Sequence, residues 1–169
     1  PATAPAALVV GLVAGALWGV VARGWMRLIA HDPAFTWEGT IGIVAIFAIF
    51  GLGQAIATVL RRRAAARGGG PRLVVAGRFV AVLTTVPMGM AAGALMLPSL
   101  LLGGAAFAVP TRRPRLRLGL ALAAFLPTLW VAWVEMADSL PLWHALAGWA
   151  LMLAVYAPLV VALGRSLAR

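Results

Sequence analysis

The side chains of this sequence that could do chemistry are few, and two of them continue a row of glycines. Arg23 and Arg27 follow Gly11, Gly15 and Gly19 at the same four-residue spacing. On a helix with 3.6 residues per turn, a step of four residues rotates by only about 40°, so the row follows one slowly turning face. An arginine at the centre of a bilayer costs at least about 2.5–3.5 kcal/mol unless it reaches the interface or meets a carboxylate. We therefore expect both arginines to bind an anionic partner, with snorkelling to the interface as the alternative for Arg27.

Two carboxylates near the end of a later apolar stretch are the candidates for acid–base chemistry. Glu135 and Asp138 lie three residues apart, so on a helix they face the same way. The C-terminal end of a helix carries partial negative charge and therefore disfavours both. The pair needs an arginine, a metal ion or a proton to balance it, and Arg23 and Arg27 are the arginines expected at the same end. A structural salt bridge is the alternative to a functional site.

Histidine and tryptophan side chains complete the candidate site. A histidine titrates near neutral pH and suits proton transfer, while tryptophans close to an acid can wall a ligand pocket or form the aromatic belt of the membrane interface. The histidine spacing matches no zinc motif, so we predict no metal site, and no cofactor is assigned. The predicted ligand-binding residues are Arg23, Arg27, His31, Asp32, Glu135, Asp138, His144, Trp130 and Trp133. The candidate catalytic residues are Glu135, Asp138 and His144.

The composition excludes a soluble protein. Of the 169 residues, 63% are hydrophobic and 11% are charged, and the mean hydropathy is +1.01. An ordinary soluble domain is roughly half apolar and about a quarter charged, and a chain this short could not hide so much apolar surface from water. Cysteine is absent, which excludes disulfides, iron–sulfur clusters and thiol nucleophiles. The sequence thus predicts an all-α, polytopic integral membrane bundle.

The apolar stretches predict six transmembrane helices in a single domain. A helix needs about 20 mostly apolar residues to cross roughly 30 Å of hydrocarbon. The first stretch exceeds the short apolar region of a secretory signal, and no basic residue precedes it, so we expect a span there. The apolar stretch 73–110 is divided in two because one helix of that length would reach about 55 Å. No polar loop marks the reversal, so whether both halves cross fully is left open. The predicted spans of the domain, residues 1–169, are 6–30, 40–60, 73–91, 93–110, 118–137 and 142–163.

The charges support this topology. All 14 basic residues are arginines, and with six spans all but Arg23 and Arg27 fall on one side of the membrane. The acids, Asp32, Glu38, Glu135 and Asp138, fall on the other side. Excess arginine in short loops marks the cytoplasmic face, so we predict that the N- and C-termini are both cytoplasmic. We expect the protein to lie in the plasma membrane. Five spans would instead expose one of the arginine-rich loops outside.

The same arginines indicate partners. Near the surface, each attracts anionic lipid headgroups by about 1 kcal/mol. They sit at span ends and not on a folded basic face, so nucleic acid is not expected as a partner.

Smaller polar residues are assigned local roles. Thr36 is expected to cap the following helix, with Glu38 in its first turn, where negative charge suits the helix dipole. The glycine row is expected to pack closely against a neighbouring helix. Threonines inside spans are expected to bond their own helix carbonyls and to do no chemistry; these are Thr58, Thr84, Thr85 and Thr128. Gln54, another polar residue inside a span, is likewise assigned no chemistry.

The sequence favours a small transporter or channel-like protein over two other classes. Its arginines would attract an anionic or amphiphilic solute, and its acids would exchange a proton or cation, in a pocket that opens outward. The second class is an intramembrane enzyme acting on a lipid-like substrate, with Glu135 or Asp138 as acid or base. The third is a structural or assembly subunit of a larger membrane complex, in which the charges form only ion pairs. Homo-oligomerisation is left open, because the glycine row suits internal and external contacts equally.

Overall fold

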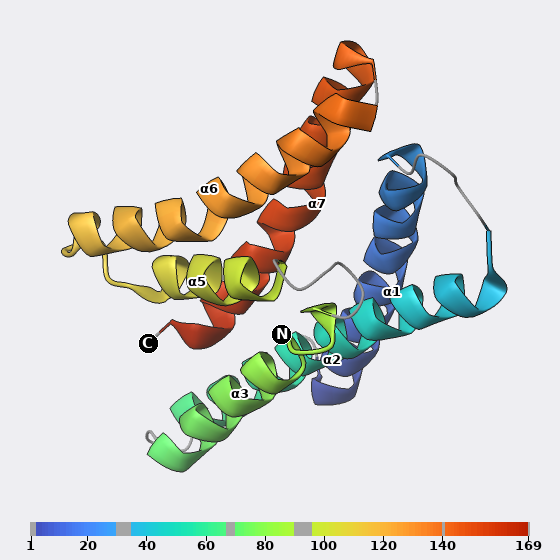
Figure 1. The fold of residues 1–169 in the computed structure, drawn as a ribbon. Helices are drawn as coiled ribbons and strands as arrows, with labels where there is room; N and C mark the ends of the chain where they lie inside the picture. Colours follow the sequence, from blue (N-terminus) through green and yellow to red (C-terminus); the bar gives the residue numbers. More distant parts are fainter. Residues whose placement is uncertain (1–2, 30–34, 67–69, 90–95, 140, 169) are drawn as a thin grey trace.

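A computed structural model of the chain describes residues 3–29, 35–66, 70–89, 96–139 and 141–168, except for the side chains of residues 29, 96, 131, 132 and 135–139. The described residues form six helices and no strand. Figure 1 shows them as two neighbouring groups, α1 with α2 and α3, and α5 with α6 and α7. The helices are α1 (Ala4–Ile29), α2 (Trp37–Ala66), α3 (Pro71–Leu83), α5 (Met96–Ala108), α6 (Pro114–Ser139) and α7 (Leu142–Leu167).

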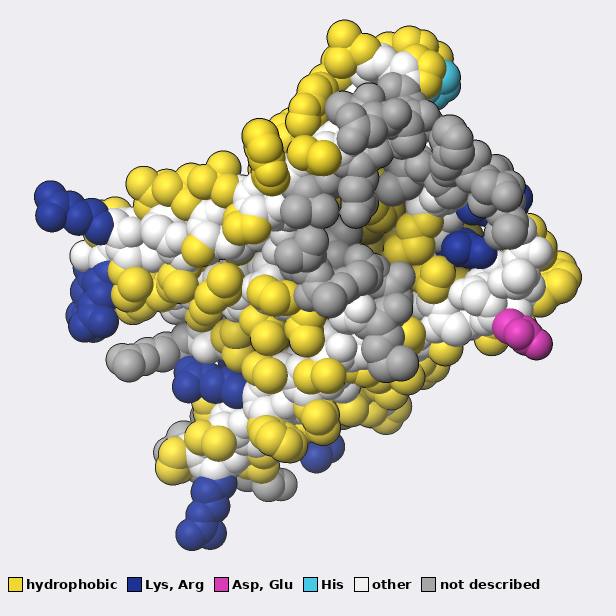
Figure 2. Space-filling view, viewed as in Figure 1, with side chains coloured by type: hydrophobic (Ala, Val, Ile, Leu, Met, Phe, Trp, Pro, Cys, Tyr) yellow, Lys and Arg dark blue, Asp and Glu magenta, His cyan; other side chains and the backbone are white. Residues whose placement is uncertain are grey.

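The length and the apolar surface of the helices suit a lipid environment. Three of them, α1, α2 and α7, are long and apolar enough to cross a membrane. At 26 residues, α6 has the length to cross as well, about 39 Å. Large apolar side chains stay on the outside, with Val10 65%, Leu17 63% and Phe79 66% exposed, and Figure 2 shows hydrophobic side chains over much of one face. Soluble monomers rarely expose so continuous an apolar surface, so the all-helical, membrane-compatible fold is confirmed.

The glycine row holds α1 against α2. A Cβ added to Gly11 would lie 2.5 Å from Ala55 Cβ, and one added to Gly19 would lie 2.9 Å from Val44 Cα. Real side chains do not fit at such distances, so the two backbones approach closely, as small-residue interfaces in lipid do. The predicted packing role of the row is confirmed. Early residues of α1 meet late residues of α2, so the two helices are antiparallel.

The next helix, α3, packs antiparallel along the second half of α2 and ends beside its middle. Near the start of this contact, a Cβ added to Gly77 would lie 3.2 Å from the Ala57 carbonyl oxygen. At its end, the Thr84 side chain occupies the space beside Gly53 that a Cβ would fill. Gly53 lies near the midpoint of α2. The interface thus stops halfway along α2.

The second group of helices has a short member of its own. Gly103 and Gly164 make the α5–α7 contact: a Cβ on Gly103 would lie 2.9 Å from Val160 Cγ1, and one on Gly164 would lie 3.1 Å from the Gly104 carbonyl oxygen. The contacts advance together along both helices, so α5 and α7 are parallel. After a short connection, α6 runs back along α5, where the hydroxyl of Ser99 hydrogen-bonds that of Thr128.

The predicted spans 73–91 and 93–110 correspond to two shorter described helices, and residues 90–95 between them lie outside the described residues. Both α3 and α5 have 13 residues, about 20 Å each, which is less than the roughly 30 Å of hydrocarbon. A turn at residues 84–87 follows α3 directly. The first turn of α5 holds Ser99, whose partner Thr128 lies near the middle of α6. No charged residue separates the two stretches, so composition alone did not reveal the turn that follows α3; whether both cross fully stays a prediction.

The helix directions gather the arginines of the helix ends at one end of the bundle. Arg63 at the end of α2, Arg72 in α3, Arg115 in α6 and Arg165 in α7 lie there, and we call this the arginine end. In Figure 2, most blue side chains lie along the left and lower edges, while the acidic side chain drawn lies at the right edge, where some blue side chains are also seen. Such segregation was predicted from the sequence.

Local predictions for small polar residues are confirmed. The Gly39 amide donates to Thr36 Oγ1 at 3.3 Å, which is the predicted cap of α2. The threonine hydroxyls of the spans donate to carbonyls three or four residues earlier in their own helices: Thr58 to Gln54, Thr84 to Val80 and Ala81, Thr85 to Ala81, and Thr128 to Ala124.

Candidate functional site

Arg23 and Arg27 both lie where α1 approaches the start of α2. Arg23 is half-buried, and its Nε donates to Thr40 Oγ1 at 3.3 Å. Arg27 is exposed, and its guanidinium carbon lies 5.1 Å from the centroid of the Phe35 ring, a cation–π distance. The seam of the glycine row therefore leads into Arg23, as expected. Arg27 lies at the exposed edge of the same end.

The other predicted site residues are only partly described. His31 and Asp32 lie outside the described residues, as do the side chains of Glu135 and Asp138. The pairing of the arginines with these acids thus stays a prediction. In the described part of the chain, no three histidine or acidic side chains come together as metal ligands would.

The aromatic members of the predicted site lie near the surface. His144 stacks on Trp143, with ring centroids 3.5 Å apart. Trp130 is 67% exposed, and Trp133 is half-buried. Trp143, at the start of α7, is also exposed, and an exposed tryptophan at a helix end suits the aromatic belt.

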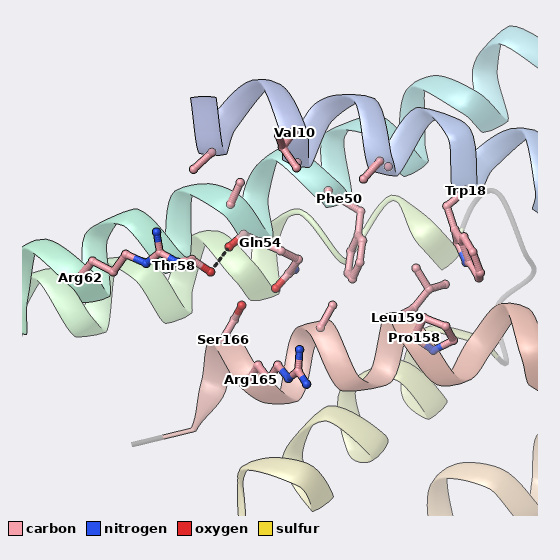
Figure 3. A pocket seen from close by; sticks show the side chains of 17 residues that line it. Val10, Trp18, Phe50, Gln54, Thr58, Arg62, Pro158, Leu159, Arg165 and Ser166 are labelled. Carbon is pink, nitrogen blue, oxygen red and sulfur yellow. Dashed lines mark hydrogen bonds between the residues drawn. The ribbon is translucent and has the colours of Figure 1, made fainter. Parts of the chain in front are cut away.

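A cavity of about 570 Å³ lies elsewhere, between α1, α2 and α7 on the side of the arginine end. Sites for small molecules span about 300–1,000 Å³, so its size suits one organic ligand. Phe50 and Gln54 of its lining are buried, whereas Ala14, Arg62 and Pro158 are exposed, so the cavity opens to the surroundings. Figure 3 shows α1 and α2 on one side of the space and α7 on the other.

Trp18 of α1 lines the cavity at its inner end, and Trp25 lies two turns beyond it on the same helix. Trp18 Nε1 donates to the Val155 carbonyl at 3.0 Å, and Trp25 Nε1 donates to the Gly148 carbonyl at 2.8 Å. We call Trp18 and Trp25 the tryptophan pair. The two donors lie seven residues apart on α1, and their acceptors lie seven residues apart on α7 in the reverse order. The two helices are therefore antiparallel here. The helices meet at the tryptophan pair and diverge toward the arginine end, and the cavity fills the space between them.

The cavity wall is mainly apolar, with a few polar groups. Gln54 is 8% exposed; its Nε2 donates to the Ala81 carbonyl at 3.2 Å, while its Oε1 has no hydrogen-bond partner in the structure. Figure 3 shows this side chain extending from α2 into the space toward α7, and Ser166 reaching toward the same space from α7. A buried acceptor without a donor costs free energy, about 1–3 kcal/mol, which a ligand or water with an O–H or N–H group would recover.

Arginines surround the mouth of the cavity. Arg62 of α2 and Arg165 of α7 line it, and both side chains are exposed. A second cavity of about 780 Å³ shares these two arginines and Thr58 in its lining, so it adjoins the mouth of the first. Arg61 Nη1 donates to the Arg165 carbonyl and ties α2 to α7 at this point.

No carboxylate is close in sequence to balance these charges. The chain contains no Asp or Glu in residues 39–134 or 139–169. The arginine end therefore carries uncompensated positive charge, which an external anion would neutralise. This feature could be read from the sequence, but its position at the mouth of a cavity could not.

The tryptophan pair was missed by sequence reasoning, which named Trp130 and Trp133 as the tryptophans of the candidate site. Their seven-residue spacing puts both on one face of α1, and this spacing was the available signal. The partners are backbone carbonyls, which no sequence pattern marks. Comparison of the chain with protein-family models, with curated proteins and with solved structures gives no match, so function has to be inferred from the chain's own residues.

Proposed function

We propose that this chain is a small integral membrane transporter of the plasma membrane, with six membrane-inserted helices and both termini in the cytoplasm. The observation that carries the proposal is the meeting of α1 and α7 at the tryptophan pair and their divergence around the cavity. A carrier exposes one site to the two sides of a membrane in turn. A cavity bounded at one end by Trp18, next to an α1–α7 contact made by two hydrogen bonds that can separate, suits such a cycle.

The arginine excess supports an orientation. Arginine-rich loops mark the cytoplasmic face, so the cavity would face inward in this state. The antiparallel contact of α1 with α7 agrees with termini on the same side. Two of the six helices, α3 and α5, would enter the membrane without crossing it fully.

The predicted outer cluster would have a separate role in this transporter. Arg23, Glu135 and Asp138 would form the coupling region on the outer side, where the acids exchange a proton or cation. The cavity lining contains arginines but neither an acid nor a histidine. It therefore favours binding over acid–base catalysis, and transport over the enzyme.

Cysteine labelling tests the proposal without knowledge of the solute. The chain has no cysteine, so Ala14→Cys places a single thiol in the cavity wall. In sealed right-side-out and inside-out membrane vesicles, a carrier should let a membrane-impermeant maleimide reach this thiol from both sides. Val21→Cys, which is 50% exposed and lies outside the cavity lining, is the control and should react from neither. Labelling of Ala14→Cys from one side only would exclude alternating access.

A further inference from the structure

We infer that the cavity between α1, α2 and α7 binds a single-chain amphiphile with an anionic headgroup, of which an alkyl phosphate is the simplest form. The inference rests on the proposed function, because the amphiphile would be the transported solute. Its headgroup would lie at Arg62 and Arg165, and its chain would extend along Phe50 toward Trp18.

Charge selects the headgroup. Arg62 and Arg165 face the same mouth from α2 and α7, and residues 39–134 and 139–169 hold no acid that could pair with them. Arginine binds phosphate and carboxylate with paired, charge-assisted hydrogen bonds. An anion with two or more oxygens is thus the ligand group that these side chains favour.

The wall selects the rest of the ligand. Beyond the arginines, the lining passes through Ala55 and Gly51 to Phe50, Leu159 and Trp18, so an alkyl chain is solvated there as it would be in lipid. Gln54 lies eight residues before Arg62 on α2, about 12 Å away along the helix. Its unpartnered Oε1 would accept a hydrogen bond from a hydroxyl or amide on the chain.

The cavity is open on the side between α1 and α7, which favours a ligand that enters from the membrane. Ala14 and Pro158, on opposite walls, are exposed, and Val10 on the rim is 65% exposed. A volume of about 570 Å³ is in the range for one small organic ligand. It suits one alkyl chain better than a two-chain lipid.

Binding of radiolabelled dodecyl phosphate to the full chain in phosphatidylcholine nanodiscs tests the inference, with empty nanodiscs measuring partition into the bilayer. We expect saturable binding that weakens about tenfold in Arg62→Gln or Arg165→Gln, as for loss of one charged hydrogen bond. Arg63→Gln is the matched control, because Arg63 is adjacent, exposed and outside the cavity lining. An equal loss in Arg63→Gln, or none in Arg62→Gln, would overturn the inference.

A second pair of variants tests the cavity itself. Ala14→Phe would fill the opening between α1 and α7 and should abolish saturable binding. Val13→Phe changes a neighbour that is 49% exposed and not part of the lining, and it should bind as the wild type does. Unchanged binding by Ala14→Phe would place the amphiphile outside the cavity and contradict the inference.

Competitors distinguish the sources of the anion. Excess inorganic phosphate or dodecyltrimethylammonium should leave dodecyl phosphate bound, and phosphatidylglycerol in the nanodisc should displace little of it. Displacement by inorganic phosphate would indicate a free-anion site, and displacement by phosphatidylglycerol a site for bilayer lipid; either result overturns the inference. If dodecyl phosphate binds as expected but Ala14→Cys reacts from one side only, the proposal of a transporter is overturned and the inferred binding site is kept. If Ala14→Cys is labelled from both sides but dodecyl phosphate does not bind, the inferred amphiphile site is overturned and the transporter proposal is kept.

Discussion

Gly19 and Gly24 stand five residues apart on α1 but meet different surroundings. A Cβ on Gly19 would lie 2.9 Å from Val44 Cα, whereas one on Gly24 would meet nothing within 4 Å. We expect Gly19→Ala to lower the free energy of unfolding by about 1–3 kcal/mol, since the backbones must separate. Gly24→Ala should be neutral or stabilising by up to about 1 kcal/mol. Titration with SDS in micelles, followed by circular dichroism, measures both, and equal effects would show that the glycine row does not set the approach of α1 to α2.

Two glutamates provide a test of the outer cluster. Glu38 lies in the first turn of α2 and is exposed, where it complements the helix dipole. Glu135 is the predicted proton-exchanging acid. We expect Glu135→Gln to remove the dependence of dodecyl phosphate uptake on a pH gradient in proteoliposomes, while Glu38→Gln retains it. Uptake by Glu135→Gln that still follows the gradient would assign coupling to another group.

Local residue chemistry was predictable, and contacts between distant segments were not. The Thr36 cap depends on the three residues that follow it, and the threonine hydroxyls of the spans bond carbonyls three or four residues earlier, so a short window of sequence contains both partners. The bond of Trp18 to the Val155 carbonyl crosses 137 positions. Its acceptor is a backbone carbonyl, which every residue has, so the residue type at position 155 does not indicate the contact.

At the scale of elements, the long helices were predictable because their ends coincide with charge or turn residues. The stretch 73–110 was different, because no charged residue follows the end of α3, where Thr84, Thr85 and Pro87 are the markers in the sequence. Tertiary packing contributes to the end of α3. The Thr84 side chain packs against Gly53, and its hydroxyl donates a hydrogen bond to the Val80 carbonyl at 2.9 Å. A helix whose end depends on a partner 31 positions away cannot be delimited by hydropathy.

The half-length of α3 gives a labelling prediction. Val86 lies in the turn after α3 and is 48% exposed, about 20 Å from the start of the helix. We expect Val86→Cys to react with a small membrane-permeant maleimide only slowly and with an impermeant one from neither side. Arg63→Cys at the arginine end and Trp143→Cys at the opposite end are the controls and should each be labelled from one side. Rapid reaction of Val86→Cys from outside would restore the full predicted span 73–91.

At the scale of the whole molecule, the two helix groups run in opposite directions but are not copies. The first group has helices of 26, 30 and 13 residues and the second has 13, 26 and 26. An inverted repeat would place the short helix at the same position in both groups, and here the order is reversed. In the proposed transporter, motion between the groups would therefore not exchange equivalent states. Closure would depend on α7, because this helix carries both acceptors of the tryptophan pair and part of the cavity wall.

A cross-link across the cavity mouth tests whether that closure occurs during transport. Val10 of α1 and Ala162 of α7 both line the cavity, so a reducible link between Val10→Cys and Ala162→Cys would hold the mouth at fixed width. We expect the link to stop dodecyl phosphate uptake and dithiothreitol to restore it, because the α1–α7 spacing must change in each cycle. Val10→Cys with Ala55→Cys is the matched control: both residues line the cavity, but they belong to the tightly packed α1–α2 pair, where a Cβ on Gly11 would lie 2.5 Å from Ala55. That link should leave uptake nearly unchanged. Full uptake with the α1–α7 link in place would mean that the cavity conducts without moving, as in a channel.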